Sequence, residues 1–114
     1  MNSLRNSVKL IGYLGADPEI KRFEGGKIKA QLNIATNETY RNAKGEKVIS
    51  TQWHRLVAWG KTAEYLEKYT KKGMELAIEG RLSHRSYEDK EGIKKFITEV
   101  VINEALFLSK SEAS

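Results

Sequence analysis

Four aromatic residues in this chain each have a basic residue next to them or two positions away. The aromatics are Tyr40, Trp53, Trp59 and Tyr87, and their basic neighbours are Arg41, Arg55, Lys61 and Arg85. An exposed ring offers a nucleic-acid base a flat apolar face for stacking, and a nearby cation contacts the phosphate that accompanies the base. Aromatic residues in strand-like segments are also common in cores, so each ring taken alone fits either interpretation about equally well. Their joint arrangement predicts a surface for single-stranded nucleic acid.

Basic residues near these rings are the candidates for contacts with phosphate. They are Arg41, Lys47, Arg55, Lys61, Arg81 and Arg85. Arg81 and Arg85 share the parity of Tyr87 on a predicted strand, so a nucleic-acid strand that passes over this ring brings its phosphates close to them. Stacking and phosphate contacts do not read base edges, and we therefore expect little sequence preference.

Composition limits the class of protein. The length of 114 residues suits one domain, and 20 Lys and Arg against 15 Asp and Glu give a net charge of +5, which weakly supports a polyanionic partner. The absence of cysteine excludes disulfides and thiolate metal sites. Neither an apolar run of signal-peptide length nor one of about 18 residues occurs. We expect a cytoplasmic protein, associated with the nucleoid and not with a membrane.

The sequence carries no motif of an enzyme. His54 and His84 fall on different predicted strands, and neither has the spacing of a metal-binding motif. Gly25-Gly26 lacks the lysine and the helix that follow a phosphate-binding loop. We therefore expect no catalytic residue, no metal site and no cofactor.

Alternating apolar and polar residues predict the strands that carry the candidate site. Five main strands are expected at 8–14, 28–34, 51–59, 76–87 and about 94–108, with a brief pairing segment at 20–23. On the third strand, one face carries Trp53, Arg55, Val57 and Trp59, and the other carries His54, Leu56 and Ala58. On the fourth, the residues expected to face inward are Leu76, Ile78, Gly80 and Leu82.

One helix is expected between the third and fourth strands, from Lys61 to Lys72. Thr62 is its predicted N-cap and Gly73 its C-terminal stop. The inward stripe of this helix is Ala63, Leu66 and Tyr69. The polar segment 37–50 has the composition of an exposed, mobile loop, and we interpret it as a flexible hairpin arm.

This order of elements predicts an all-β protein with the OB-fold, a five-stranded Greek-key barrel with one helix between strands 3 and 4 and extended hairpin arms. The barrel domain is expected to span residues 1–108, and residues 109–114 form a short polar tail. A shared fold does not by itself establish function.

Short motifs follow one another along nearly the whole chain. They are Gly12, Leu14, Gly15 and Asp17-Pro18-Glu19; Ala35-Thr36-Asn37-Glu38; Trp53-His54-Arg55 with Gly60-Lys61; Tyr69, Lys72-Gly73 and Glu79-Gly80-Arg81; and Thr98-Glu99-Val100-Val101. In this order and spacing the chain resembles the bacterial single-stranded DNA-binding proteins of the replicative type. The resemblance implies that the four aromatics carry most of the base stacking. It also implies single-stranded DNA as the partner and a non-enzymatic role in DNA replication, recombination and repair.

The resemblance further implies a homotetramer and ties His54 to subunit contacts. From the residues alone, a lone histidine beside Leu56 and Ala58 is more often a satisfied structural residue than a ligand. The edge of the first strand, with Val8 and Leu10, is a second candidate contact between subunits, because an unpaired strand edge invites pairing with a symmetry mate.

Typical members of this family follow the barrel with a long linker and an acidic tip that recruits other enzymes. In this chain the only acidic residue after Ser109 is Glu112. The sequence therefore predicts either a member that naturally lacks the acidic tail or a chain cut at the end of the barrel, and it puts partner recruitment through a tail in doubt. Two alternatives are a tail-less accessory subunit of the primosomal type, which would have less need of all four aromatics, and an RNA-binding cold-shock-like domain, whose aromatic motifs are not found.

Overall fold

Strands make up most of residues 3–108, the part of the chain that the computed structural model describes. The elements are η1 (Ser3–Arg5), β1 (Val8–Leu14), β2 (Glu19–Arg22), η2 (Glu24–Gly26), β3 (Ile28–Arg41), β4 (Lys47–Trp59), α1 (Gly60–Tyr69), β5 (Glu75–Glu88) and β6 (Lys94–Phe107). The predicted polar tail, 109–114, lies outside the described residues.

The sheet closes on itself. Its strand order is β1-β5-β6-β4-β3-β2, and a further pairing of β1 with β3 closes the barrel through Tyr13↔Ala35 and Leu14↔Ile34. Gly12 permits this closure, because a Cβ there would lie 2.4 Å from the carbonyl oxygen of Ala35. The five long strands and α1, the one α-helix within residues 3–108, confirm the predicted OB-fold, with the helix between the third and fourth main strands.

The core fills the barrel under α1. Ile34, Leu56, Leu66 and Leu76 are fully buried, and each comes from a different element. The predicted inward positions Ala63 and Leu66 are buried as expected. Tyr69 is not, because it ends the helix at the surface and its ring packs on Tyr65, at 5.2 Å between centroids.

Leu82 is also wrongly predicted to face the core. At 43% exposure it lies beyond the point where β5 leaves the barrel, just after the register shift between Glu79 and Gly80. The close approach of Gly80 to Val101 marks this point, since a Cβ on Gly80 would lie 2.1 Å from the carbonyl oxygen of Val101.

The helix has different ends from those predicted. It covers Gly60–Tyr69, and the N-cap position belongs to Trp59, whose backbone is extended and which makes no capping hydrogen bond through its side chain. Thr62 therefore lies within the helix and does not cap it. At the other end the backbone is already extended at Thr70, whose hydroxyl donates to the carbonyl of Leu66 at 2.6 Å.

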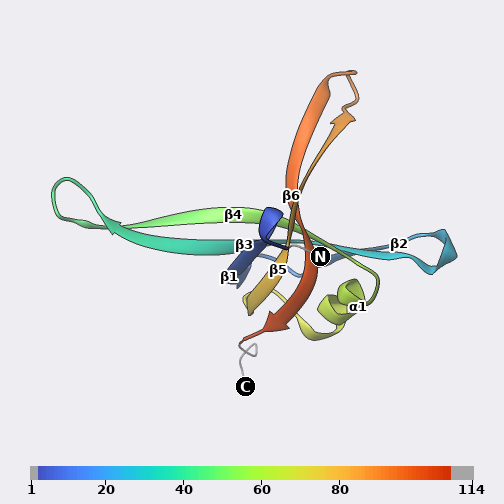
Figure 1. The fold of residues 1–114 in the computed structure, drawn as a ribbon, viewed down its shortest axis with the longest axis horizontal. Coiled ribbons are helices and arrows are strands. Elements are labelled where there is room, and N and C mark those ends of the chain that lie inside the picture. Colours follow the sequence, from blue (N-terminus) through green and yellow to red (C-terminus); the bar gives the residue numbers. More distant parts are fainter. Residues whose placement is uncertain (1–2, 109–114) are drawn as a thin grey trace.

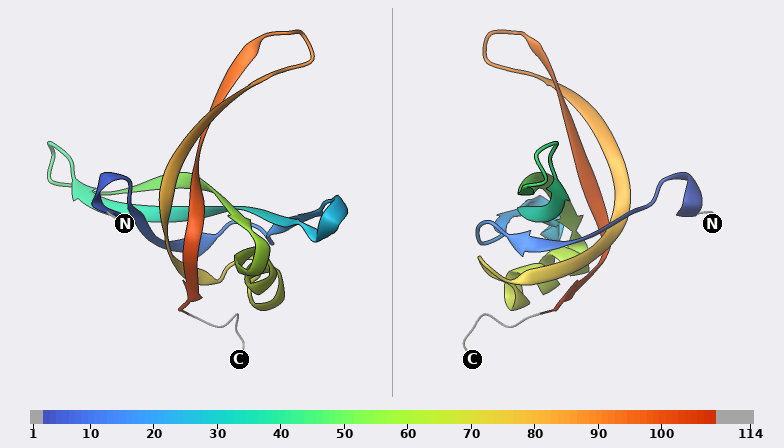
Figure 2. Two further views of the ribbon diagram at one scale, coloured as in Figure 1. Left: turned by 45° about the vertical axis from the view of Figure 1, so that its right-hand side comes forward. Right: turned by 90° about the vertical axis from the view of Figure 1, so that its left-hand side faces the viewer.

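Hairpins project from the barrel in three directions (Figures 1 and 2). We call the paired segments 36–52 and 83–98 the β3–β4 arm and the β5–β6 arm. The prediction of a loop at 37–50 is wrong, because β3 and β4 stay paired as far as Arg41↔Lys47. The prediction of a hairpin is confirmed. Its turn is held by the Asn42 side-chain oxygen, which accepts from the backbone amides of Lys44 and Glu46, each at 2.9 Å.

Candidate nucleic-acid interface

All four candidate stacking rings lie at the surface. Exposure is 53% for Tyr40, 61% for Trp53, 46% for Trp59 and 43% for Tyr87. Buried aromatics would be inaccessible to a base, so these values leave stacking open at each position. They do not by themselves place the rings on one surface.

Two of the rings share one face of β4 with a basic residue between them. The alternation along β4 puts Leu56 and Ala58 into the core and leaves Trp53, Arg55 and Trp59 on the opposite side, which we call the outer face. The two tryptophans are six residues apart, about 20 Å at the rise of a strand. Arg55 is exposed, and no acidic side chain within residues 3–108 forms an ion pair with it.

The outer face continues across the neighbouring strands. Val57 on β4 pairs with Val101 on β6, and Val101 pairs with Arg81 on β5. Paired residues point to the same side of a sheet, so Arg81 lies in the same row as Val57. The register thus puts Arg55 and Arg81 on the same side of the sheet although they come from different hairpins, and Val57 on that side is only 2% exposed.

Trp53 is held in place by the barrel. Its ring lies against Gly15, where a Cβ would be 2.6 Å from Cζ3 and 2.8 Å from Cη2 of the indole. In the ladder Trp53 pairs with Ala35, and Ala35 pairs with Tyr13, so a small residue lies between the two rings. Because Gly15 has no side chain, the indole can pack directly against its backbone, and we call this contact the seat of Trp53.

Trp59 has neighbours of a different kind. Its ladder partner Lys29 places Nζ 5.6 Å from the centre of the ring. The ring of Phe23, at the end of β2, is stacked on Trp59 with 6.1 Å between centroids and 29° between planes. Phe23 is not among the four aromatics that the sequence predicts to stack on bases, although its position just before Gly25-Gly26 places it near a hairpin turn.

The other two candidate rings lie on separate arms. Tyr40 pairs with Val48 on the β3–β4 arm, five ladder steps or about 17 Å from Trp53 and on the opposite parity. Tyr87 pairs with Lys95 on the β5–β6 arm, on the same parity as Arg85. The structure brings Trp53 and Trp59 together on one strand, and it does not bring Tyr40 or Tyr87 to the same strand face.

Some of the basic residues predicted to contact phosphate already have partners in the protein, and others do not. Arg85 donates from Nε to Oε2 of Glu99 at 3.1 Å, and Glu99 is only 7% exposed. The other oxygen of this carboxylate, Oε1, is buried without a hydrogen-bond partner among the described residues. Arg41 donates to the carbonyl of Gly45 at 2.8 Å. The exposed Lys47 and Lys61 form no ion pair within residues 3–108.

Each histidine is hydrogen-bonded to a threonine on the neighbouring strand. His54 Nε2 is 2.9 Å from Oγ1 of Thr36, and His84 Nδ1 is 2.9 Å from Oγ1 of Thr98. His54 is half-buried on the core side of β4, which fits a structural role. Within residues 3–108 no group of three or more His, Asp or Glu side chains could hold a metal ion.

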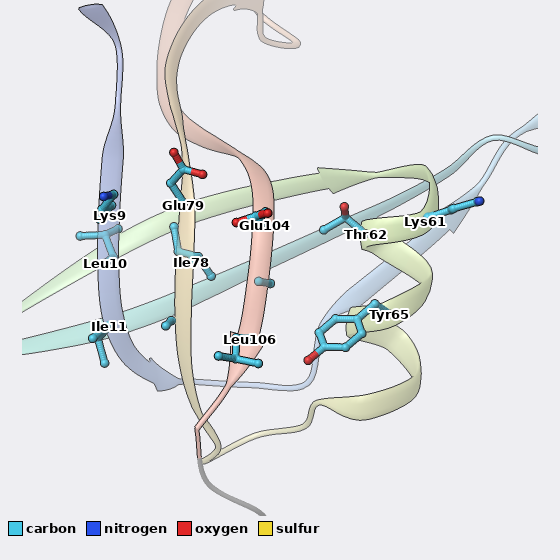
Figure 3. Close-up of a pocket in the computed structure, with 12 residues that line it drawn as sticks. Lys9, Leu10, Ile11, Lys61, Thr62, Tyr65, Ile78, Glu79, Glu104 and Leu106 are labelled. Atoms are coloured by element: carbon cyan, nitrogen blue, oxygen red, sulfur yellow. The ribbon is translucent and has the colours of Figure 1, made fainter. Parts of the chain in front are cut away.

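The first strand has an open edge beside an apolar hollow. Of β1, only Tyr13 and Leu14 pair with β3, so Val8 to Gly12 have a strand partner on one side only within the described residues. The side chains of Val8 and Leu10 pack against the core. The hollow lies between β1, β5, β6 and α1, where Ile11 and Leu106 are exposed and Lys61 extends away from the other lining residues (Figure 3).

None of the helices in 3–108 has the length and apolar character needed to cross a membrane.

Comparisons with known proteins agree with one another. Residues 5–108 match the Single-strand binding protein family. The chain is 41% identical over 109 residues to Single-stranded DNA-binding protein 1 of Chlorobaculum tepidum, which covers 95% of this chain and 67% of that protein. It is 38% identical over 108 residues to Single-stranded DNA-binding protein 1 of Xylella fastidiosa, with 94% and 79% covered.

Solved structures show the same fold. The Plasmodium falciparum SSB in complex with ssDNA has a TM-score of 0.84 and 32% identity, covering 91% of this chain and 95% of that one. A deletion mutant of the single-stranded DNA binding protein from Thermus aquaticus has a TM-score of 0.81 and 30% identity, with 93% and 51% covered.

Proposed function

The chain belongs to the single-strand binding protein family, and from this premise we propose that it binds single-stranded DNA and coats and protects it during replication, recombination and repair. The observation that carries the proposal is the outer face of β4, where Trp53 and Trp59 are exposed on either side of Arg55. This combination of flat rings and a free cation fits a strand whose bases are unpaired.

Stacking supplies the sequence-tolerant part of the binding energy. A base on an exposed ring is worth roughly 1 to 3 kcal/mol by alanine substitution. Trp53 meets the base with its ring already seated on Gly15, so little side-chain freedom is lost on binding. The rings of Tyr40 and Tyr87 extend the same chemistry onto the arms, as the family resemblance implies.

Phosphate contacts supply the salt-dependent part. Arg55 and Arg81 lie on the outer face, and Lys47, Lys61 and Arg41 are exposed close to the candidate rings in the sequence. In Arg85 the Nε group is engaged by Glu99, and the terminal nitrogens remain for a phosphate oxygen. None of these contacts reads a base edge, so we expect little sequence preference.

We also propose self-association as a homotetramer. The support is the open edge of β1 from Val8 to Gly12, together with Ile11 and Leu106 exposed at the adjoining hollow. Pairing of this edge with a second copy would satisfy backbone groups that have no strand partner in the monomer. Val8, Leu10 and His54 stay proposed interface residues, with the His54 ring positioned by Thr36.

The role we propose is non-enzymatic, requires no cofactor and is carried out in the cytoplasm. The relatives are named for binding single-stranded DNA. An accessory subunit of the primosomal type is not favoured, because all four aromatics are exposed and available for stacking.

Tryptophan fluorescence provides the test, because the chain has 2 tryptophans and both lie in the proposed site. The intact protein is titrated with an oligothymidylate and with a duplex of the same length, and the mass of each complex is measured. We expect quenching by the single strand, much weaker binding to the duplex and a mass that corresponds to a tetramer. Equal affinities, or an unchanged emission, would contradict the proposed function.

A further inference from the structure

The β2–β3 hairpin presents an aromatic residue that none of the predicted contacts uses. Phe23 follows β2 and precedes η2, and its side chain is 44% exposed. It is not part of the buried core cluster. One side of the ring is stacked on Trp59, a proposed DNA-binding residue on a different hairpin.

This hairpin holds Phe23 in a defined position. The amide of Phe23 donates to the carbonyl of Lys27 at 2.8 Å, and the amide of Gly26 donates to the carbonyl of Phe23 at 3.3 Å. Arg22 forms an ion pair with Glu67 on α1, with 2.7 Å between Nη2 and Oε1. The backbone on both sides of Phe23 is therefore ordered before binding, which lowers the conformational entropy lost when the ring contacts a ligand.

The surroundings of the pair are those of a nucleic-acid contact. Lys29 lies over the Trp59 ring, and Lys21 pairs with Lys29 in the ladder. Two small hollows adjoin the pair, one lined by Phe23 and Arg22 and the other by Trp59, and both are bordered by Lys27. Glu64 also lines the first hollow and Arg22 is paired with Glu67, so Lys27 is the basic residue at both hollows that forms no ion pair within residues 3–108.

The geometry selects the face that a base would use. A base between two rings needs two stacking spacings of about 3.4 Å each, or nearly 7 Å between the ring centres. The centroids of Phe23 and Trp59 are 6.1 Å apart, which leaves no room for a base between them. A base can therefore reach only the surface of Phe23 that Trp59 does not cover, and 44% of the side chain is exposed.

We propose that Phe23 is a fifth base-stacking residue, which extends the path of single-stranded DNA from Trp59 onto the β2–β3 hairpin. This inference rests on the proposed function. A ring that served only to support Trp59 would do so best if it were buried, whereas Phe23 keeps nearly half of its surface in solvent. The basic residues Lys21 and Lys27 would lie beside the phosphates of the added nucleotides.

The test compares Phe23→Ala, Phe23→Leu and Phe23→Tyr in the intact protein, with a labelled oligothymidylate as the probe and anisotropy as the readout. We expect affinity to fall at least about fivefold in the alanine and leucine variants and to be kept in the tyrosine variant, which retains the ring. Phe96→Ala is the matched control, because Phe96 is also exposed but lies on the opposite parity of its arm from Tyr87. Its affinity should be unchanged.

A Trp59→Ala background separates direct stacking from support of Trp59. If Phe23 stacks on a base itself, Phe23→Ala still weakens binding in this background. No further loss there, or full affinity of Phe23→Leu in the normal background, would overturn the inference while leaving the proposed function intact. Equal binding of single strand and duplex by the unmodified protein would instead overturn the proposed function.

Discussion

The rings on the barrel and the rings on the arms have similar exposure but different support. Trp53 lies against Gly15, and Trp59 is flanked by Phe23 and Lys29. Tyr40 and Tyr87 lie on two-stranded arms, where no ring within residues 3–108 is stacked on either of them. Exposure therefore identifies rings that a base can reach, and the neighbours of each ring decide how much of its ordering is complete before DNA arrives.

Ordering before binding has a thermodynamic consequence. Immobilising a side chain on binding costs about 0.5 to 1.5 kcal/mol. An isolated two-stranded hairpin is marginally stable in water. We therefore expect a tyrosine on an arm to contribute less net binding free energy than Trp53, even when the stacking contact in the complex is equally good.

The largest effect should follow Trp53→Ala. This change removes a seated ring, and we expect a loss of roughly 1 to 3 kcal/mol in binding free energy, or about 5-fold to 150-fold in affinity. Anisotropy titration of a labelled oligothymidylate measures it, and the fold is checked by circular dichroism. A loss smaller than that from either arm tyrosine would break the distinction between barrel and arm.

Gly15→Ala should have the next largest effect and tests the seat itself. The added Cβ would lie 2.6 Å from the Trp53 ring, so the indole must move. We expect a loss of about 1 kcal/mol in binding free energy and a shift in tryptophan emission. Combined with Trp53→Ala, the glycine change should cost nothing further in affinity. Additive losses in the double variant would show that Gly15 acts through another part of the barrel.

Tyr40→Ala and Tyr87→Ala should each cost less than Trp53→Ala, because part of the stacking energy is spent on ordering the arm. We expect up to about 1 kcal/mol for each. The same titration measures both variants, and Tyr40→Phe serves as the control that keeps the ring. Hydrogen exchange should show stronger protection of 36–52 when DNA is bound. Equal protection with and without DNA would mean that the arm is already ordered.

Arg55→Gln and Arg85→Gln should have the smallest effects on affinity but a distinct effect on its salt dependence. For a single strand, log K falls with log salt at about −0.7 for each phosphate neutralised. Removing Arg55 should flatten the slope by about this amount. Arg85 should change it less, because Glu99 already neutralises part of its charge. Titrations at several salt concentrations measure the slope, and a slope unaltered by Arg55→Gln would exclude it as a phosphate contact.

Sequence reasoning succeeded where the structure repeats a local pattern. The alternation along β4 placed Trp53, Arg55 and Trp59 on one side and Leu56 and Ala58 on the other, as the structure does. It failed where burial does not vary along the chain. The segment 37–50 is mostly polar because a two-stranded arm has no core, so the sequence indicates a flexible hairpin arm there and not the continuous strand pairing that the structure has.

The sequence by itself determined the barrel, its helix and the residue types of the candidate interface, because side-chain alternation and turn chemistry are local properties of the chain. Only the tertiary structure decided that Gly15 makes a seat for Trp53, that Phe23 stacks on Trp59 and that Glu99 engages Arg85. Each of these contacts joins residues that lie at least 14 positions apart in the sequence. Closure of the barrel and the register of its ladders bring them together, and no spacing along the chain encodes that approach.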